Sequence, residues 1–405
     1  MPALLPIFKK AYWSLGALVA GYVTVLLLLT SPWLQRHALY SHKLHSGFYH
    51  NVNNPESFGF APKQVTPFNV NTPDGETLYA WHVLPLNVYA RHNRDLLEQD
   101  TSLEATAHIT SSKAFRLLTR DPDAKIVINF HGNAGHVAQG WRTDTYRSLT
   151  GIPNTHVLTI DYRGFGLSTG SPTEAGLITD GVALVNWVID VAGIPPDRIV
   201  ILGQSLGTAV ASAVALRFAD PASDLFPIQP TGAAEVKKSI VFAGVVLVAP
   251  FTSLPSLLLT YRIGGLVPVL APLRPYPYLL RLFTSRIVDT WRSADRLAAY
   301  MNTLTDSPLC TGKGGSELGG IQIIHALNDQ DISFRQGEML FATAANTSLE
   351  TNARFGERVS KKMNVKMEGK PMIRLDVVEH GGHNRIVTYA SVALAVMRAF
   401  GDFVE

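Results

Sequence analysis

The sequence of 405 residues contains a single cysteine, Cys310, so no disulfide bond can form within the chain. No group of Cys and His residues has the spacing of a zinc site, and we expect neither a metal nor a cofactor. The 35 Lys and Arg residues nearly balance the 32 Asp and Glu residues, and no basic run carries interleaved aromatic residues. The small net charge of +3 therefore gives no indication of nucleic acid as a partner.

Charged residues are also missing from residues 11–35, whose centre at 15–29 is almost wholly apolar. About 20 apolar residues are enough to span the hydrocarbon core as a helix. Tyr12, Trp13 and Trp33 lie near the two ends of this stretch, where aromatic rings favour the membrane interface. We therefore predict a transmembrane helix within residues 1–36 that is an uncleaved anchor, because the apolar core of a signal peptide is usually shorter.

From this anchor we expect a single-pass membrane protein of the endoplasmic reticulum or another endomembrane. Residues 37–63 are rich in His, Asn and Ser, and they are interpreted as a solvated juxtamembrane linker. The main domain is then expected to occupy residues 64–405.

Within that domain, apolar runs typical of strands alternate with helical segments. The strand runs lie at 125–130, 156–160, 199–202, 245–249, 321–325 and 373–378, after a hairpin at 65–84 around Pro73-Asp74-Gly75. A closing helix is expected over residues 384–403. This alternation predicts an α/β fold, with a mostly parallel sheet covered by helices on both faces.

Three stretches interrupt the alternation. Residues 252–300 are too apolar for a solvated loop and too rich in proline for one regular element, so we interpret them as a cap over the sheet. Residues 87–123 and 343–371 are polar, and they are interpreted as surface insertions.

The pentapeptide Gly-Gln-Ser-Leu-Gly at 203–207 lies between a strand run and a helix rich in small apolar residues. A G-x-S-x-G sequence at a strand-to-helix turn is typical of a nucleophile elbow, in which the glycines allow a tight turn that exposes the serine hydroxyl above the sheet. Ser205 is therefore the candidate nucleophile. In the competing interpretation, Ser205 only caps the helix.

A serine nucleophile needs a base, usually histidine, and a carboxylate that orients the base. His383 lies between the last strand run and the closing helix and is the candidate base, with His380 as the nearby alternative. Asp329 and Asp331 follow the strand run at 321–325, and either could reach an imidazole.

An oxyanion hole also needs backbone N–H groups at the edge of the sheet. The turn His-Gly-Asn-Ala-Gly at 131–135 directly follows the strand run at 125–130. We predict that the N–H of Asn133 in this turn and the N–H of Leu206 form the oxyanion hole.

Together, these segments resemble the α/β-hydrolase family, and more narrowly the membrane-anchored acylglycerol and lysophospholipid lipases of the abhydrolase-domain group. The resemblance covers residue 64 to the C-terminus, and its motifs lie at 131–135, 161–168, 170–174, 203–207, 249–253, 325–334 and 382–384. It implies a catalytic triad of Ser205, Asp329 and His383. Asp331 stands where the family usually has an apolar residue, and Arg163 is expected to form a structural ion pair.

The main hypothesis is a membrane-anchored serine hydrolase that cleaves acyl esters of monoacylglycerol or lysophospholipid type through an acyl-enzyme. Its partners would be the lipid substrate and the bilayer. The alternative is an acyl-protein thioesterase, or depalmitoylase, of the same fold. A non-catalytic membrane binding module is a third hypothesis, but the ordered Ser, Asp and His residues argue against it.

Overall fold

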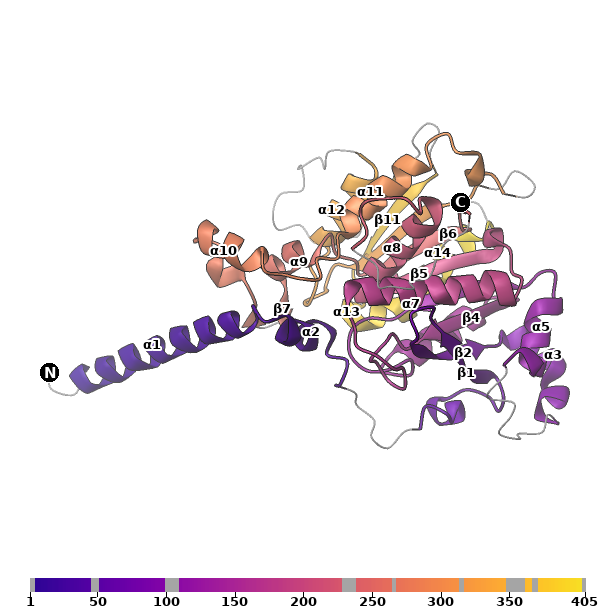
Figure 1. Ribbon diagram of the computed structural model, residues 1–405, viewed down its shortest axis with the longest axis horizontal. Coiled ribbons are helices and arrows are strands. Elements are labelled where there is room, and N and C mark those ends of the chain that lie inside the picture. The colour runs from indigo at the N-terminus through magenta and orange to yellow at the C-terminus, as the bar shows by residue number, and fades with distance from the viewer. Residues whose placement is uncertain are drawn as a thin grey trace.

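The computed structural model describes residues 4–44, 51–98, 109–227, 238–263, 267–312, 317–346, 361–365 and 371–402. A long helix, α1 (Leu4–Leu28), projects from a body built around a twisted sheet (Figure 1). Within α1, Phe8–Leu28 has a mean hydropathy of 1.7, and 6 % of it is buried. By length and composition this helix is therefore a candidate membrane span.

The central sheet has nine strands among the described residues, in the order β1-β2-β4-β3-β5-β6-β9-β11-β10. In this order, the six strands from β4 to β11 pair in parallel. The strands β1, β2 and β10 run antiparallel to their neighbours. The strands are β1 (Val65–Asn71), β2 (Thr77–Val83), β3 (Lys125–Phe130), β4 (Thr155–Ile160), β5 (Ile199–Gln204), β6 (Gly244–Val248), β9 (Gly320–Ala326), β10 (Lys361–Val365) and β11 (Ile373–Val378). The hairpin and the six strand runs expected from the sequence are confirmed.

Helices cover both faces of the sheet, as the apolar strand runs predict. Along β3, Ile126 and Ile128 pack into one hydrophobic cluster and Val127 packs into another, which is the alternation of a strand buried on both sides. The first cluster is closed by α7 (Glu174–Asn186), α8 (Leu206–Ala219), α11 (Ser293–Thr303) and α12 (Arg335–Ala344). The second is closed by α6 (Arg142–Thr150) and α14 (Ala390–Ala399).

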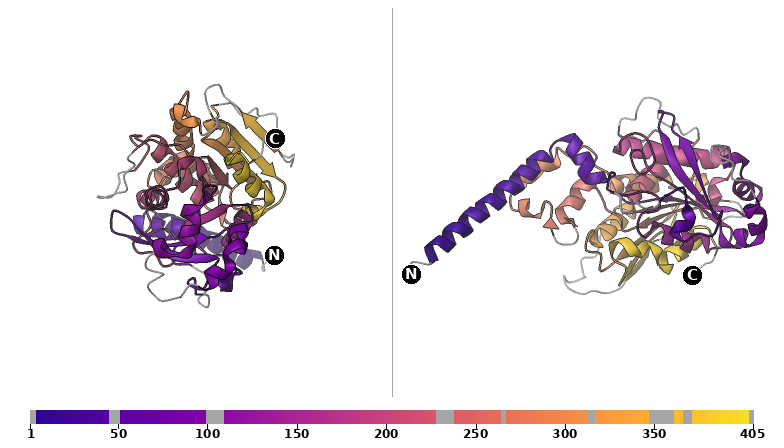
Figure 2. Two further views of the ribbon diagram at one scale, coloured as in Figure 1. Left: turned by 90° about the vertical axis from the view of Figure 1, so that its right-hand side faces the viewer. Right: turned by 90° about the horizontal axis from the view of Figure 1, so that it is seen from below.

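The apolar insertion after β6 does lie beside the sheet, next to the end of α1 (Figure 2). It contains α9 (Leu254–Thr260), a short ribbon of β7 (Arg262–Ile263) and β8 (Val267–Pro268), and α10 (Pro277–Thr284). The expected boundary at residue 300 is wrong, because α11 buries Ser293, Leu297 and Tyr300 against the main core, which includes α8 and α12. We use "cap" for residues 252–292.

Other boundaries also differ from expectation. The interpretation of residues 37–63 as a solvated linker is wrong for its first part, because α2 (Pro32–Tyr40) crosses residue 37, and Tyr40 and His42 are buried; residues 45–50 lie outside the described residues. The single closing helix is instead α13 (Gly382–Arg385), a 3-10 turn and α14. The break falls at Tyr389, whose extended backbone (φ −78°, ψ 151°) cannot continue a helix.

The two polar insertions contain regular structure where they are described. Residues 87–123 carry α3 (Leu86–Leu97), a 3-10 turn and α5 (Lys113–Arg120), with residues 99–108 outside the described part. Residues 343–371 contribute the edge strand β10, which the sequence analysis missed; residues 347–360 and 366–370 are not described.

Arg163 lies in the loop after β4 and connects two distant elements. Its guanidinium pairs with Asp74 in the β1–β2 turn and with Asp180 in α7, each at 2.8 Å. The Asp180 carboxylate also accepts a hydrogen bond from the Arg163 backbone N–H at 2.8 Å. The ion-pair role expected for Arg163 is thus confirmed, and it is buried.

Removing one partner of this buried network should destabilise the fold strongly. The Asp180→Ala variant removes one of the two carboxylates that pair with the buried Arg163 guanidinium, and we expect the free energy of unfolding to fall by about 3–5 kcal/mol. Urea unfolding in detergent, followed by tryptophan fluorescence, measures the change. Asp295→Ala is the matched control, because its pair with Arg292 is half exposed and should contribute about 0–1 kcal/mol. Equal losses in the two variants would contradict the assignment.

Candidate active site

Ser205 occupies a sharp turn between β5 and α8. Its backbone has φ 51° and ψ −119°, a region that residues other than glycine rarely adopt. A Cβ on Gly203 would lie 2.2 Å from the carbonyl oxygen of Gly207, and a Cβ on Gly207 would lie 2.0 Å from the carbonyl oxygen of Phe130. Both glycines are therefore required by backbone packing around Ser205, as expected for a nucleophile elbow.

The candidate nucleophile, base and acid are joined by hydrogen bonds. The His383 Nε2 atom lies 3.0 Å from the Ser205 Oγ atom, and His383 Nδ1 lies 2.8 Å from Asp329 Oδ2. Because the carboxylate only accepts, Nδ1 carries the proton and Nε2 accepts from the serine hydroxyl. The Gln204 side chain donates to the His383 carbonyl at 3.2 Å and helps to hold the base in position.

Asp329, rather than Asp331, contacts the imidazole of His383. Asp329 Oδ1 accepts the backbone N–H groups of Asp331 at 3.0 Å and Ile332 at 2.9 Å, which orients Oδ2 toward His383. His380 is exposed and lies 3.8 Å from the carboxylate of its neighbour Glu379.

A second histidine, His325, also contacts Asp329. The sequence analysis missed it as a site residue. It is buried on β9, and its Nε2 atom lies 3.3 Å from Asp329 Oδ2 and 3.0 Å from the Ile332 carbonyl oxygen. Its position four residues before Asp329 was the only sequence signal for this contact.

The electrostatics of the pair favour a charged acid and a basic histidine. Burial alone would raise the pKa of Asp329, but the hydrogen bonds from His325 and His383 outweigh it and hold the pKa well below its usual value. Burial alone would lower the pKa of His383, but the hydrogen bond and charge of Asp329, with the charge of Asp331, raise it above 6.5.

The turn at residues 131–135, here called the oxyanion loop, passes close to Ser205. A Cβ on Gly132 would lie only 3.4 Å from the Ser205 Cβ atom. The N–H groups of Ala134 and Gly135 donate to carbonyls of Tyr40 and Leu44 in the N-terminal segment, whereas no acceptor within the described residues engages the N–H of Asn133. Asn133 and Leu206, the two residues expected to form the oxyanion hole, both line the cavity that contains Ser205.

Arg142 fixes the shape of the oxyanion loop, and the sequence analysis missed it. This buried guanidinium donates from Nη2 to the carbonyls of Gly132 (3.0 Å), Asn133 (3.0 Å) and Ala134 (2.8 Å). In a trans peptide the C=O and the following N–H point in opposite directions. Holding the Gly132 carbonyl therefore directs the Asn133 N–H away from Arg142.

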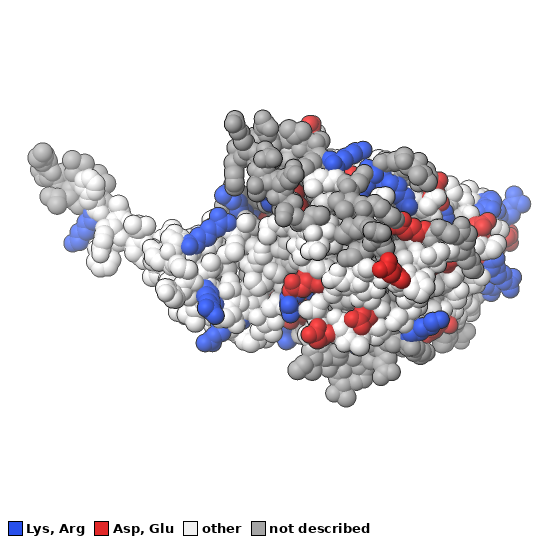
Figure 3. Space-filling view, turned by 90° about the horizontal axis from the view of Figure 1, so that it is seen from above, with Lys and Arg blue, Asp and Glu red and all other residues white. Residues whose placement is uncertain are grey.

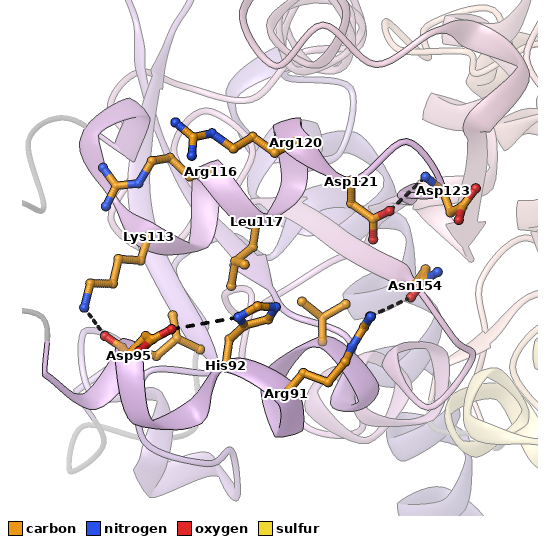
Figure 4. A pocket seen from close by; sticks show the side chains of 12 residues that line it. Arg91, His92, Asp95, Lys113, Arg116, Leu117, Arg120, Asp121, Asp123 and Asn154 are labelled. Atoms are coloured by element: carbon orange, nitrogen blue, oxygen red, sulfur yellow. Dashed lines mark hydrogen bonds and ion pairs between the residues drawn. The ribbon is translucent and has the colours of Figure 1, made fainter.

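The cavity above Ser205 has a volume of about 580 Å³ and a mostly apolar wall. Ser205 and His383 lie on this wall with side chains from three regions: the N-terminal segment (residues 4–44), the cap, and the loop that carries Asp331. A separate cavity of about 530 Å³ lies between α3 and α5 and is lined by charged side chains such as Arg91, Asp95 and Lys113 (Figure 4). It shares no lining residue with the cavity at Ser205.

Asp329, Asp331 and His383 place atoms of metal-ligand type within 4.8 Å of one another. Both ring nitrogens of His383 are already hydrogen-bonded, to Asp329 and to Ser205, so a metal would have to displace one of these bonds. The arrangement is that of a base held between an acid and a hydroxyl.

The comparisons with known proteins identify the class. The model of the alpha/beta hydrolase family matches residues 126–395, and the chain belongs to this family. An alpha/beta hydrolase from Vibrio vulnificus shares the fold, with a TM-score of 0.52, 13 % identity, and coverage of 92 % of each chain.

Two curated relatives match about half of the chain. The chain is 26 % identical to the lysophosphatidylserine lipase ABHD12 of Danio rerio over 208 residues, which cover 51 % of this chain and 48 % of the relative. It is 30 % identical to the human protein ABHD12B over 225 residues, which cover 55 % and 50 % of the two chains. The chain thus spans about half the length of the curated relatives it matches.

The two neighbouring carboxylates should differ sharply in their effect on turnover. Asp329→Asn removes the charge that stabilises the imidazolium and should lower kcat by about 10³–10⁴-fold. Asp331→Asn, the matched control, should lower it less than about tenfold, because Asp331 acts on His383 only through its charge. Hydrolysis of a 4-nitrophenyl ester gives both rates. A larger loss in Asp331→Asn would reverse the assignment of the acid.

The raised pKa of His383 is expected to set the acid limb of the pH profile of kcat/KM. Only the neutral imidazole accepts a proton, so kcat/KM should fall as pH drops through the pKa of His383, at a pH above 6.5. In Asp331→Asn the loss of a negative charge should move this limb to lower pH. Stopped assays of both proteins across the pH range measure the midpoint of the acid limb in each. A wild-type midpoint below pH 6.5 would contradict the expected direction.

Proposed function

We propose that the protein is a serine hydrolase that cleaves acyl esters of lipids, of monoacylglycerol or lysophospholipid type, with Ser205, His383 and Asp329 as its catalytic triad. The single observation that carries this proposal is the hydrogen-bonded chain from Asp329 through His383 to Ser205, which opens into a mostly apolar cavity. A lipase among the relatives supports the same substrate class.

The reaction proceeds in two acyl transfers. His383 Nε2 takes the proton of the Ser205 hydroxyl as Oγ attacks the ester carbonyl, and Asp329 stabilises the resulting imidazolium. The N–H groups of Asn133 and Leu206 receive the negative charge that develops on the carbonyl oxygen, each donor contributing about 3 kcal/mol. His383 then protonates the leaving alcohol, which leaves Ser205 acylated.

Water completes the cycle. His383 removes a proton from a water molecule as its oxygen attacks the acyl-enzyme, and a second oxyanion forms at the same amides. Collapse of this intermediate returns the proton to Ser205 and releases the fatty acid. The products are one carboxylic acid and one alcohol for each ester and water consumed.

The first helix supports a proposal for where the enzyme is located in the cell. We propose that residues 1–36 form a single-pass anchor in the endoplasmic reticulum or another endomembrane, and that residues 64–405 form the catalytic domain. An anchor of this kind keeps the site beside substrates that partition into the bilayer. The membrane-spanning length of α1 supports this proposal.

Labelling with a fluorophosphonate probe tests the nucleophile. Wild-type protein should be labelled at one site, and Ser205→Ala should abolish labelling and lower kcat by about 10⁴-fold or more. Ser212→Ala is a suitable control, because Ser212 is buried within α8 and donates to the Thr208 carbonyl. Retained labelling of Ser205→Ala would overturn the assignment.

A substrate panel tests the class of ester. Wild type and Ser205→Ala are compared on monoacylglycerols, lysophosphatidylserine, other lysophospholipids and an acyl-thioester of a peptide. We expect Ser205-dependent release of fatty acid from the lipid esters. Turnover of the thioester alone would identify a depalmitoylase instead.

A further inference from the structure

The end of α1 is packed against the cap rather than isolated from the protein. Leu26 is only 3 % exposed and clusters with Leu270 and Leu273 of the cap, whereas its neighbour Leu27 is 60 % exposed. The Tyr22 hydroxyl donates to the Val269 carbonyl at 2.9 Å. One side of the last turns of α1 therefore belongs to the folded domain (Figure 2).

The cavity at Ser205 extends to this side of α1. Its wall includes Leu26 of α1 and, in the turn just after α1, Leu29 and Thr30, as well as Ser205 and His383. Around Ser205, the lining residues Leu254 and Leu257 belong to the main hydrophobic core, whereas Leu26 and Leu270 belong to a separate cluster.

Leu258 packs against both clusters and also lines the cavity. The apolar wall is therefore continuous from the candidate nucleophile to the candidate membrane span.

We propose that the last turn of α1 forms the far wall of the acyl-binding site. A single long acyl chain then lies along Leu258 and ends against Leu26 and Leu29, while its ester carbonyl is at Ser205. The acyl chain reaches this site directly from the bilayer that α1 would span. This inference rests on the proposed function, and it makes the anchor a determinant of acyl-chain selectivity.

The surface next to α1 fits a bilayer as the source of that chain. On α10, Tyr278 is 89 % exposed, and Leu279 and Leu282 are also exposed. Residues 252–292 contain five arginines and one acidic residue, Asp289. In Figure 3 the charged side chains toward the α1 end of the molecule are mainly blue, as expected for a surface beside lipid head groups.

The hydrogen bonds between α2 and its surroundings keep this wall in place. The Tyr40 carbonyl accepts the Ala134 N–H at 2.9 Å, and the Tyr40 hydroxyl donates to Asp289 of the cap at 2.7 Å. The Gln35 side chain donates to the Arg286 carbonyl and accepts the Val288 N–H. Removing the N-terminal segment would therefore disturb the oxyanion loop and the cap together, so point variants of the full chain are the sharper test.

Adjacent leucines of α1 provide that test. Full-length wild type, Leu26→Trp, Leu26→Ala and Leu27→Trp are reconstituted in phosphatidylcholine vesicles and assayed on 4-nitrophenyl butyrate and palmitate. Leu26→Trp fills the far end of the site and should lower the palmitate-to-butyrate ratio of kcat/KM about tenfold. Leu26→Ala removes contacts with the long chain and should lower the ratio about threefold. Leu27→Trp faces away from the cavity and should leave the ratio within about twofold of wild type.

Each result decides the inference. Fluorophosphonate labelling identifies variants that fold; if Leu26→Trp is not labelled, the ratio of Leu26→Ala decides. An unchanged ratio in the labelled Leu26 variants, or an equal loss in Leu27→Trp, overturns the role of α1 while the proposed function stands. A wild type that is neither labelled at Ser205 nor active on butyrate overturns the proposed function itself.

Discussion

The site depends on one backbone constraint, the conformation of Ser205 between β5 and α8. A residue other than glycine with φ 51° and ψ −119° costs about 1–3 kcal/mol, and only tight surrounding structure maintains it. Gly203 and Gly207 provide that structure, because their backbones approach each other and the end of β3 more closely than any side chain would allow. The loops after β3, β9 and β11 end at the same edge of the sheet, which is where parallel strands bring ligand-binding groups together.

Two buried charges then flank Ser205 with opposite signs. Asp329 accepts two backbone N–H groups besides its contacts with His383 and His325, and Arg142 donates to four loop carbonyls. A buried charge is stable only when it is hydrogen-bonded in this way. In the proposed reaction the negative charge supports the imidazolium, while the positive charge lies behind the loop whose amide is the candidate oxyanion donor. The polarity of the site is thus present before a substrate binds.

The sequence alone predicts those parts of the site that local chemistry dictates. Ser205 lies in a turn whose glycines are spaced by steric need, and the strand runs are apolar because both faces of the sheet are buried. Arg142, however, acts on carbonyls of a loop up to ten residues before it, and no local pattern identifies those acceptors. The position of α11 likewise depends on α8 and α12, so composition alone assigned most of this helix to the cap.

The wrong interpretation of the first part of residues 37–63 has the same origin, and it has the largest consequence for the site. Polar, histidine-rich composition is typical of a solvated linker, but the end of α2 and the residues after it are held by backbone carbonyls that any residue type would supply, at Tyr40 and Leu44. These carbonyls engage the N–H groups of Ala134 and Gly135, which follow Asn133, whereas the Asn133 N–H has no acceptor among the described residues. An N-terminal segment that begins as a candidate membrane span therefore ends by shaping the candidate oxyanion hole. The candidate membrane span and the candidate reaction centre are in this way linked through one short helix.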